Sequence, residues 1–256
     1  MVAYKTPREL AIMREAGRVV ALTLERVAKA AVPGVRPVEL DAIAARTIKE
    51  HEAWPSFLHY HPRWAPSPYP ATLCLSVNDV VVHGIPDTRP LRAGDILSID
   101  CGAVLGGYHG DAAITIPIGS VDAGAARLLE VTERALRHGI EAAVAGGRLG
   151  DIGHAVQSVA RAAGYGILEG CTGHGIGTAM HEEPAAVPNT GPPGRGMRLR
   201  EGLTIAIEPM FIEGGHDAGR MLPDGWAIAT ADRSRGAHFE HTIAITADGP
   251  VVLTAP

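Results

Sequence analysis

The first thirty residues place apolar side chains at helical spacing. They recur at intervals of three and four residues, at Leu10, Met13, Gly17, Val20, Leu24 and Val27. Such a stripe predicts one helix face packed against a core. Before it, Thr6, Pro7 and Glu9 match the N-cap, the first helical residue and the acid of a capping box. We therefore expect a helix that begins after Thr6 and ends before Pro33-Gly34.

A second predicted helix, about Pro37 to His51, has a counterpart later in the chain. Residues 30–49 read AAVPGVRPVELDAIAARTIK, and residues 142–161 read AAVAGGRLGDIGHAVQSVAR. Both contain Ala-Ala-Val, and the glycines Gly34 and Gly146 and the arginines Arg36 and Arg148 match. One match could arise by chance in an alanine-rich chain, so further matches in the same order decide the interpretation.

Three more pairs of motifs recur. His83-Gly84-Ile85 matches His174-Gly175-Ile176, Leu91-Arg92-x-Gly94 matches Leu199-Arg200-x-Gly202, and His109-x-Asp111-x-x-Ile114 matches His238-x-Glu240-x-x-Ile243. We interpret the repeat as a duplication with halves of about 1–118 and 119–256, each a helix pair followed by an antiparallel sheet and related by an approximate two-fold axis. Helices followed by runs of strands favour a single integrated α+β domain over an alternating parallel sheet.

The apolar strand that ends in Asp100 is followed by a probable return strand that contains Asp111. If the turn is Leu105-Gly106, Asp100 lies opposite Asp111. Directly opposed residues have β-carbons about 4.5–5.5 Å apart, and two carboxylates at that distance repel unless a cation or proton lies between them. A solvated pair at a hairpin edge is the alternative.

The repeat adds two more acids, Glu208 at the position of Asp100 and Glu240 at the position of Asp111. Each follows apolar sequence, so we expect these carboxylates at the ends of buried strands. Uncompensated buried charges cost several kcal/mol each, so four carboxylates favour two divalent cations over a solvated acidic patch. His174, between glycines, is the natural nitrogen ligand. This oxygen-rich set suits manganese, iron(II) or cobalt at least as well as zinc.

Composition narrows the possible functions. The chain has 46% hydrophobic and 20% charged residues, as in ordinary globular proteins, and a net charge of -5 that argues against a nucleic-acid partner. Cys74, Cys101 and Cys171 lie far apart, which supports neither a zinc ribbon nor a disulfide framework. The start has no apolar leader and no run approaches 18 apolar residues, so we expect a cytoplasmic protein without a membrane partner.

Five segments together resemble the type I methionine aminopeptidases. They are residues 72–86 (TLCLSVNDVVVHGIP), 100–111 with Asp at both ends, 173–184 (GHGIGTAMHEEP), 207–209 (IEP) and 239–242 (FEHT). The resemblance runs from Thr6 to Thr254, and the ordered set is far more specific than any single motif. It implies the pita-bread fold, whose two pseudo-symmetric halves agree with the repeat.

The resemblance also implies site roles. Asp100 would bind one metal ion, His174 and Glu208 the other, and Asp111 and Glu240 both. His83, His181 and Glu208 would be catalytic, and the substrate would contact Tyr69, Cys74, His83, Met180, His181 and Trp226. Met180 stands where the family commonly has an aromatic residue. The segment from Trp54 to Pro70 is longer than the usual loop, so Tyr60 cannot be equated with a pocket residue, and His59 and His61 are expected to be solvated.

We therefore expect a hydrolase that removes the N-terminal methionine from nascent proteins and peptides with a hydroxide bridging two divalent metal ions (Co, Mn, Fe(II) or Zn). Glu208 would transfer the proton, His181 would stabilise the oxyanion and His83 would orient the substrate. The expected partners are nascent polypeptides and the ribosome, and the expected state is a monomer. The alternatives are an Xaa-Pro aminopeptidase or prolidase, and a non-catalytic binding module on the same fold.

Overall fold

A computed structural model describes residues 2–256. Their four helices form two pairs, as the repeat predicts: α1 (Pro7–Ala30), α2 (Pro37–Glu50), α3 (Ala123–Ala142) and α4 (Leu149–Ala163). The α1 cap is the predicted capping box, with the Thr6 N–H donating to the Glu9 carboxylate at 2.7 Å. The helix stops at Ala30, before the Pro33-Gly34 turn.

Strands follow each helix pair. After α2 come β1 (Trp54–Pro55), β2 (Leu73–Val77), β3 (Val80–Val82), β4 (Ile96–Leu105) and β5 (Tyr108–Pro117). After α4 come β6 (Gly166–Ile167), β7 (Gly173–Gly175), β8 (Glu182–Val187), β9 (Thr204–Ile207), β10 (Met210–Ile212), β11 (Gly219–Met221), β12 (Ile228–Thr230), β13 (Gly236–His238), β14 (Glu240–Thr246) and β15 (Gly249–Val252).

The main sheet joins strands from both halves. Its order is β1-β4-β5-β14-β9-β7-β8, with β2 also paired to β4 and β15 to β14, and all of these pairs are antiparallel. The halves meet where β5 pairs with β14, at Ala112 with His241 and Ala113 with Glu240. The predicted α+β class with a curved antiparallel sheet is confirmed.

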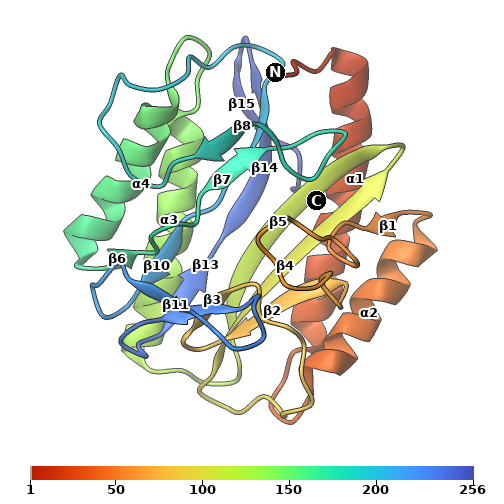
Figure 1. Cartoon of the computed structure of the whole chain (residues 1–256), viewed down its shortest axis with the longest axis vertical. Helices are drawn as coiled ribbons and strands as arrows, with labels where there is room; N and C mark the ends of the chain where they lie inside the picture. Colours follow the sequence, from red (N-terminus) through yellow and green to blue (C-terminus); the bar gives the residue numbers. More distant parts are fainter. Residues whose placement is uncertain (1) are drawn as a thin grey trace.

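Each helix pair packs on its own part of the sheet. Figure 1 shows α1 and α2 on one side and α3 and α4 on the other, with the strands between them. One apolar cluster joins α1 and α2 to β4 through Val20, Leu40 and Leu97. A second joins α3 and α4 to β9 and β14 through Leu128, Ile152 and Ile243. The sheet face away from the helices is thereby left to form the site.

The matched helices α2 and α4 begin in the same way. The backbone N–H of Arg36 donates to Glu39 at 2.9 Å, and that of Arg148 donates to Asp151 at 2.7 Å. The sequence match at these positions thus reflects the same local hydrogen bond. A boundary between halves near residue 118 stays a prediction; it would lie in the connection between β5 and α3.

The predicted register of the β4–β5 hairpin is wrong. The turn is Gly106-Gly107, Leu105 pairs with Tyr108, and Asp100 therefore lies opposite Ala113, while Asp111 lies opposite Gly102. Both turn glycines have positive φ, at 58° and 82°. A turn at Leu105-Gly106 would have required positive φ at Leu105, which is unfavourable for a residue with a branched side chain. Asp100 and Asp111 are diagonal neighbours on one face, because a shift of two residues preserves the face.

Within residues 2–256, no helix is both long enough and apolar enough to cross a membrane. The chain ends beside its beginning: the Arg14 guanidinium donates to the carbonyls of Leu253 at 3.0 Å and Ala255 at 2.8 Å. The same helix packs closely against this segment at Gly17, where an added β-carbon would lie 2.0 Å from the Leu253 oxygen.

We predict that Gly17→Ala lowers the free energy of unfolding by roughly 1–3 kcal/mol, because backbone must move to admit the methyl group. Arg18→Ala, a change on the exposed face of the same helix, is the control and should alter it by less than about 0.5 kcal/mol. Urea unfolding followed by circular dichroism measures both. Equal stabilities for the two variants would show that α1 and the C-terminal segment are not in tight contact.

Candidate active site

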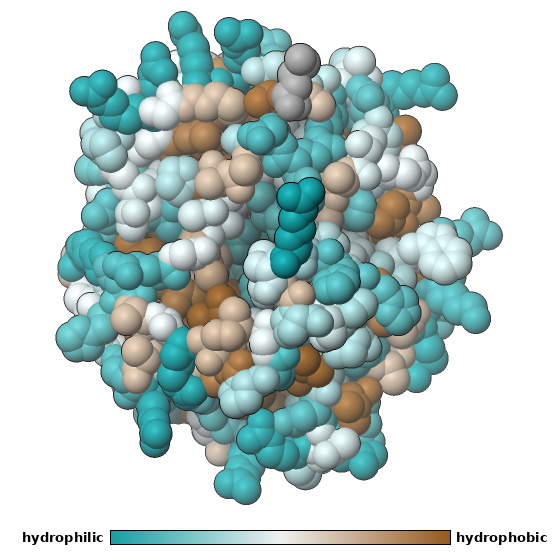
Figure 2. Space-filling view, viewed as in Figure 1, coloured by the Kyte–Doolittle hydropathy of each residue, from teal (hydrophilic) through white to brown (hydrophobic). Residues whose placement is uncertain are grey.

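One cavity of about 580 Å³ gathers all of the predicted site residues. Its lining includes Tyr69, Cys74, His83, Asp100, Asp111, His174, Met180, His181, Glu208, Trp226 and Glu240. These positions span both halves of the chain, so no local segment could have formed the site. Figure 2 shows the corresponding face hollowed near its centre, with apolar residues appearing among hydrophilic ones.

Strand register explains how three of the four carboxylates meet. Ala113 of β5 pairs with Asp100 on one side and with Glu240 on the other, so these acids flank β5. Asp111 lies two residues away on β5, hence on the same face. Glu208 follows β9, the neighbour of β14. Glu208 and Glu240 lie at strand ends as predicted, whereas Asp100 and Asp111 lie inside long strands.

His174 supplies an imidazole with a defined tautomer. Its Nδ1 lies 2.9 Å from the carbonyl oxygen of Gly175, which can only accept a hydrogen bond, so Nδ1 carries the proton. The unprotonated Nε2 faces Asp111 and Glu208, each at 3.8 Å. Gly173 permits this placement, because a β-carbon there would lie 2.3 Å from the Ala206 oxygen of β9.

The sequence analysis did not select His238, although it lies in the same cluster. Its Nε2 is 3.4 Å from Glu208 and 3.9 Å from Glu240, and the side chain is buried. The available signal was its position two residues before Glu240, since alternate residues of a strand share a face. Its counterpart in the repeat, His109, instead contacts Ser56 at 2.9 Å.

Several buried polar atoms in this cluster have no hydrogen-bond partner among residues 2–256. They are Oδ1 of Asp100, Oδ1 of Asp111, Oε1 of Glu240, Nε2 of His238 and Nδ1 of His83. Two groups of side chains could each hold an ion, because the ligand atoms within each group lie within 4.8 Å of one another. One group is Asp111, His174 and Glu240, and the other is Glu208, His238 and Glu240. Unpartnered oxygen and nitrogen lone pairs gathered in this way fit divalent cations.

Burial dominates the electrostatics of the cluster. It raises the pKa of Asp100 to about 7, and the carboxylate of Glu208 adds to the effect. Burial, followed by the neighbouring acids, also raises the pKa of Asp111 and of Glu240 well above their usual range. Without a cation, the folded protein therefore favours protonated acids at this site.

The two histidines predicted to contact substrate are neutral at pH 7. Burial lowers the pKa of His83 to about 4 and that of His181 to about 3, where nearby imidazoles contribute further. His83 lines the cavity and adopts φ of 58°, a conformation uncommon for a residue with a side chain. A neutral imidazole can donate one hydrogen bond and accept another.

The apolar end of the cavity is formed by four of the six residues predicted to contact substrate. Tyr69, Cys74, Met180 and Trp226 belong to one buried cluster together with Phe57. Trp226 and Tyr69 meet edge to face, with ring centroids 5.0 Å apart. The Tyr69 hydroxyl is near the carbonyls of Leu73 at 3.0 Å and Gly84 at 2.8 Å, which places its ring. This arrangement suits a flexible apolar side chain.

The long loop from Trp54 to Pro70 contributes residues to the cavity that the sequence analysis did not predict. His59 and His61 are exposed, as expected. Tyr60, however, lines the cavity, and its hydroxyl lies 2.9 Å from Nδ1 of His181. Trp64 lines it as well. The extra loop length hid both residues, because a longer loop leaves the positions of its side chains open until it is folded.

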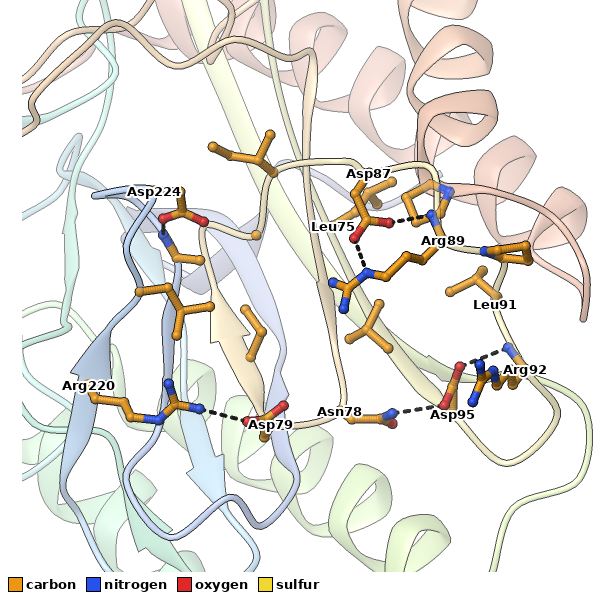
Figure 3. A pocket seen from close by; sticks show the side chains of 18 residues that line it. Leu75, Asn78, Asp79, Asp87, Arg89, Leu91, Arg92, Asp95, Arg220 and Asp224 are labelled. Atoms are coloured by element: carbon orange, nitrogen blue, oxygen red, sulfur yellow. Dashed lines mark hydrogen bonds and ion pairs between the residues drawn. The ribbon is translucent and has the colours of Figure 1, made fainter.

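A second cavity, of about 540 Å³, lies beside β2 and β3 and carries no comparable chemistry (Figure 3). Two pairs of its charged side chains bond to each other: Arg89 to Asp87 at 2.5 Å and Arg220 to Asp79 at 3.1 Å. Asp95 accepts from the Asn78 amide at 2.8 Å. Because these groups are already partnered, the carboxylate-lined cavity is the candidate active site.

Comparisons with known proteins agree with this assignment. The sequence profile of metallopeptidase family M24 matches residues 11–247. The chain is 47% identical to methionine aminopeptidase 1 of Bacillus subtilis, with 99% of each covered. The crystal structure of methionine aminopeptidase from Thermotoga maritima superposes with a TM-score of 0.94 at 39% identity, covering 100% of both chains.

Prolidase from Pyrococcus furiosus superposes with a TM-score of 0.77 at 22% identity and covers 99% of this chain and 65% of that one. At that identity the likeness shows the fold alone. The fold therefore does not separate the possible substrates, and the site must do so.

The raised pKa of Asp100 predicts that chelator-treated protein loses folding stability as the pH rises. In the unfolded chain the carboxyl ionises near pH 3.8, whereas in the folded chain it stays protonated up to about pH 7. Stability is therefore lost as the pH rises through this window. Asp100→Asn removes the cost, so its melting temperature should exceed that of the wild type by a margin that grows from pH 4 to 7, reaching roughly 5–10 °C.

The lowered pKa values of His83 and His181 have the opposite effect, because they make stability rise with pH. Comparing the variant with the wild type at the same pH cancels this effect, since both proteins contain the two histidines. Asp248→Asn, at an exposed turn, is the matched control and should show a constant difference from the wild type. Differential scanning calorimetry in EDTA gives all three curves. A margin for Asp100→Asn that does not change with pH would contradict the buried, repelled carboxylate.

Proposed function

This chain belongs to metallopeptidase family M24, and we propose that it hydrolyses the peptide bond after an N-terminal methionine. The observation that carries the proposal is the juxtaposition, in one cavity, of a buried carboxylate–imidazole cluster and an apolar pocket. The first can hold catalytic metal and the second can hold a methionine side chain. The relatives named methionine aminopeptidase support the same substrate.

We propose that this cluster would hold two divalent ions: Asp100 would bind one, His174 and Glu208 would bind the other, and Asp111 and Glu240 would contribute to both. The unpartnered oxygens of Asp100, Asp111 and Glu240 support this set. The Nε2 lone pair of His174 supports it too, since a metal ligand must be the unprotonated nitrogen. The predominance of oxygen ligands suits manganese, iron(II) or cobalt at least as well as zinc.

Bound divalent ions would supply a water of lowered pKa, polarisation of the scissile carbonyl and an anchor for the free amine. The other steps fall to side chains. Glu208, at the edge of the cluster, accepts the proton of the attacking water and delivers it to the departing amine. His181 is neutral, so it donates a hydrogen bond to the oxyanion as negative charge develops there.

His83 and the apolar residues position the substrate. His83 lies beside Trp226, with ring centroids 6.4 Å apart, at the border between the cluster and the apolar pocket. From there it can bond to the substrate backbone while the methionine side chain enters among Tyr69, Cys74 and Met180. Met180 and Cys74 bring sulfur and flexible volume to this pocket, which favours an unbranched thioether over a rigid ring.

Nascent polypeptides that begin with methionine are the proposed substrates, and the cytoplasm is the proposed compartment. Binding to the ribosome and a monomeric state are further proposals. The relative named methionine aminopeptidase 1, which is 47% identical over 99% of this chain, supports a substrate with an N-terminal methionine.

We predict methionine release from Met-Ala-Ser after the protein is stripped with chelator and reloaded with manganese, iron(II), cobalt or zinc. At least one metal should restore activity by a factor of 10² or more, because a bound metal ion both activates water and stabilises charge. Mass spectrometry of the products measures release. Preferential cleavage of an Xaa-Pro peptide would favour the prolidase alternative, and failure to bind any divalent metal would favour a non-catalytic module.

Two variants should separate catalysis from metal binding. His181→Ala removes a positioned donor and should lower kcat by about 10²–10⁴ while metal content stays near normal. Asp111→Asn removes a shared ligand and should empty at least one metal site. Kinetics and elemental analysis are measured on both. Metal loss in His181→Ala, or two retained ions in Asp111→Asn, would reverse the proposed roles.

A further inference from the structure

The loop between β1 and β2 covers both histidines at the active site. Tyr60 stacks on His181, with ring centroids 5.3 Å apart and planes inclined by 23°. Trp64 stacks on His83, at 6.1 Å and 27°. In Figure 1 this orange loop crosses the middle of the face on which the strands are seen. One segment thus stacks an aromatic ring on each of these two histidines, and both rings line the cavity.

Trp64 differs from the other aromatic residues of the pocket in its exposure. Its side chain remains 55% exposed, although the indole meets buried Trp226 edge to face at 5.0 Å. Met221 of β11, 50% exposed, lines the same cavity. Large apolar side chains held open to solvent at the mouth of a cavity indicate a surface that a ligand covers.

The loop does not need the Trp64 indole to hold its shape. Trp226 donates its Nε1–H to the Ser67 carbonyl at 3.1 Å, and a His61 ring nitrogen lies 3.2 Å from the Ala65 carbonyl. Ala65 is itself buried, and Gly225, between β11 and β12, lies against Pro66. Since these contacts anchor the loop, the outward face of the Trp64 indole is free for binding.

The geometry of an extended peptide identifies what reaches Trp64, on the basis of the proposed function. Side chains alternate along an extended chain, so the first and third residues share a face about 6.6 Å apart. The methionine side chain would lie against Trp226. The second residue adjoins the scissile bond, beside the carboxylates. The third residue therefore extends outward on the side of Trp226. Trp64 lies there, with its ring centroid 5.0 Å from that of Trp226.

We propose that Trp64, together with Met221, forms a subsite for an apolar or aromatic side chain at the third position of the substrate. The subsite determines specificity beyond the scissile bond and takes no part in the chemistry. It lies outside the buried methionine pocket, so binding there adds to the affinity for longer peptides without altering recognition of the first residue.

The test compares kcat/KM for Met-Ala-Phe-Ser and Met-Ala-Ser-Ser, with metal-loaded protein. The wild type should prefer the phenylalanine peptide by about tenfold, as expected for one aromatic contact with its burial. Trp64→Ala should reduce the ratio to about two or below, and Met221→Ala should reduce it in part. Trp54→Ala removes a 76% exposed tryptophan from β1, outside the cavity lining, and should keep the full preference.

Circular dichroism and metal content of each variant confirm folding. A wild-type ratio near one, or an unchanged ratio in both Trp64→Ala and Met221→Ala, would overturn the subsite while leaving methionine release intact. A loss of preference in Trp54→Ala equal to that in Trp64→Ala would overturn it as well. Absence of methionine release from both peptides would instead refute the proposed function on which the subsite rests.

Discussion

The pairing of β5 with β14 joins the two halves of the molecule and positions the acids of the site. Only two residue pairs form it, Ala112 with His241 and Ala113 with Glu240. Thr242 strengthens it by accepting from the Asp111 N–H at 3.0 Å and donating to the Asp111 carbonyl at 2.8 Å. Because Ala113 also pairs with Asp100, this junction brings acids from both halves onto one buried face.

Gathering these acids costs stability and prepares the site for chemistry. Burial raises the pKa of Asp100, Asp111 and Glu240, so the folded protein resists their ionisation. Divalent cations would reverse this balance, which couples metal binding to folding. The helix pairs supply the compensating stability through apolar clusters on the opposite side of the sheet. Four of the five proposed ligands lie within β4, β5, β7 and β14, and the fifth directly follows β9. The loop before β2 is left to shape access.

The accuracy of the sequence predictions followed the range of the interactions involved. The start of α1 was correct because Thr6 and Glu9 decide it within one turn. The β4–β5 register was wrong by two residues because several adjacent turns were possible, and only the Gly106-Gly107 turn takes positive φ on glycine alone. The error did not move Asp100 and Asp111 to different faces, since the strand period is two. His238 and Trp64 were missed, as their neighbours come from distant segments.

Caps and helical periodicity predicted the helix pairs, and recurring motifs predicted the repeat, because these signals are local or repeated. Together with the family resemblance, the motifs also selected eleven of the side chains that line the cavity. Tertiary structure alone decided which atoms face each other: the orientation of His174 by Gly175, the approach of His238 to Glu208, and the placement of Trp64 over His83. These depend on strand register and loop path, which are set by packing between segments far apart in the chain and so leave no short-range pattern to read.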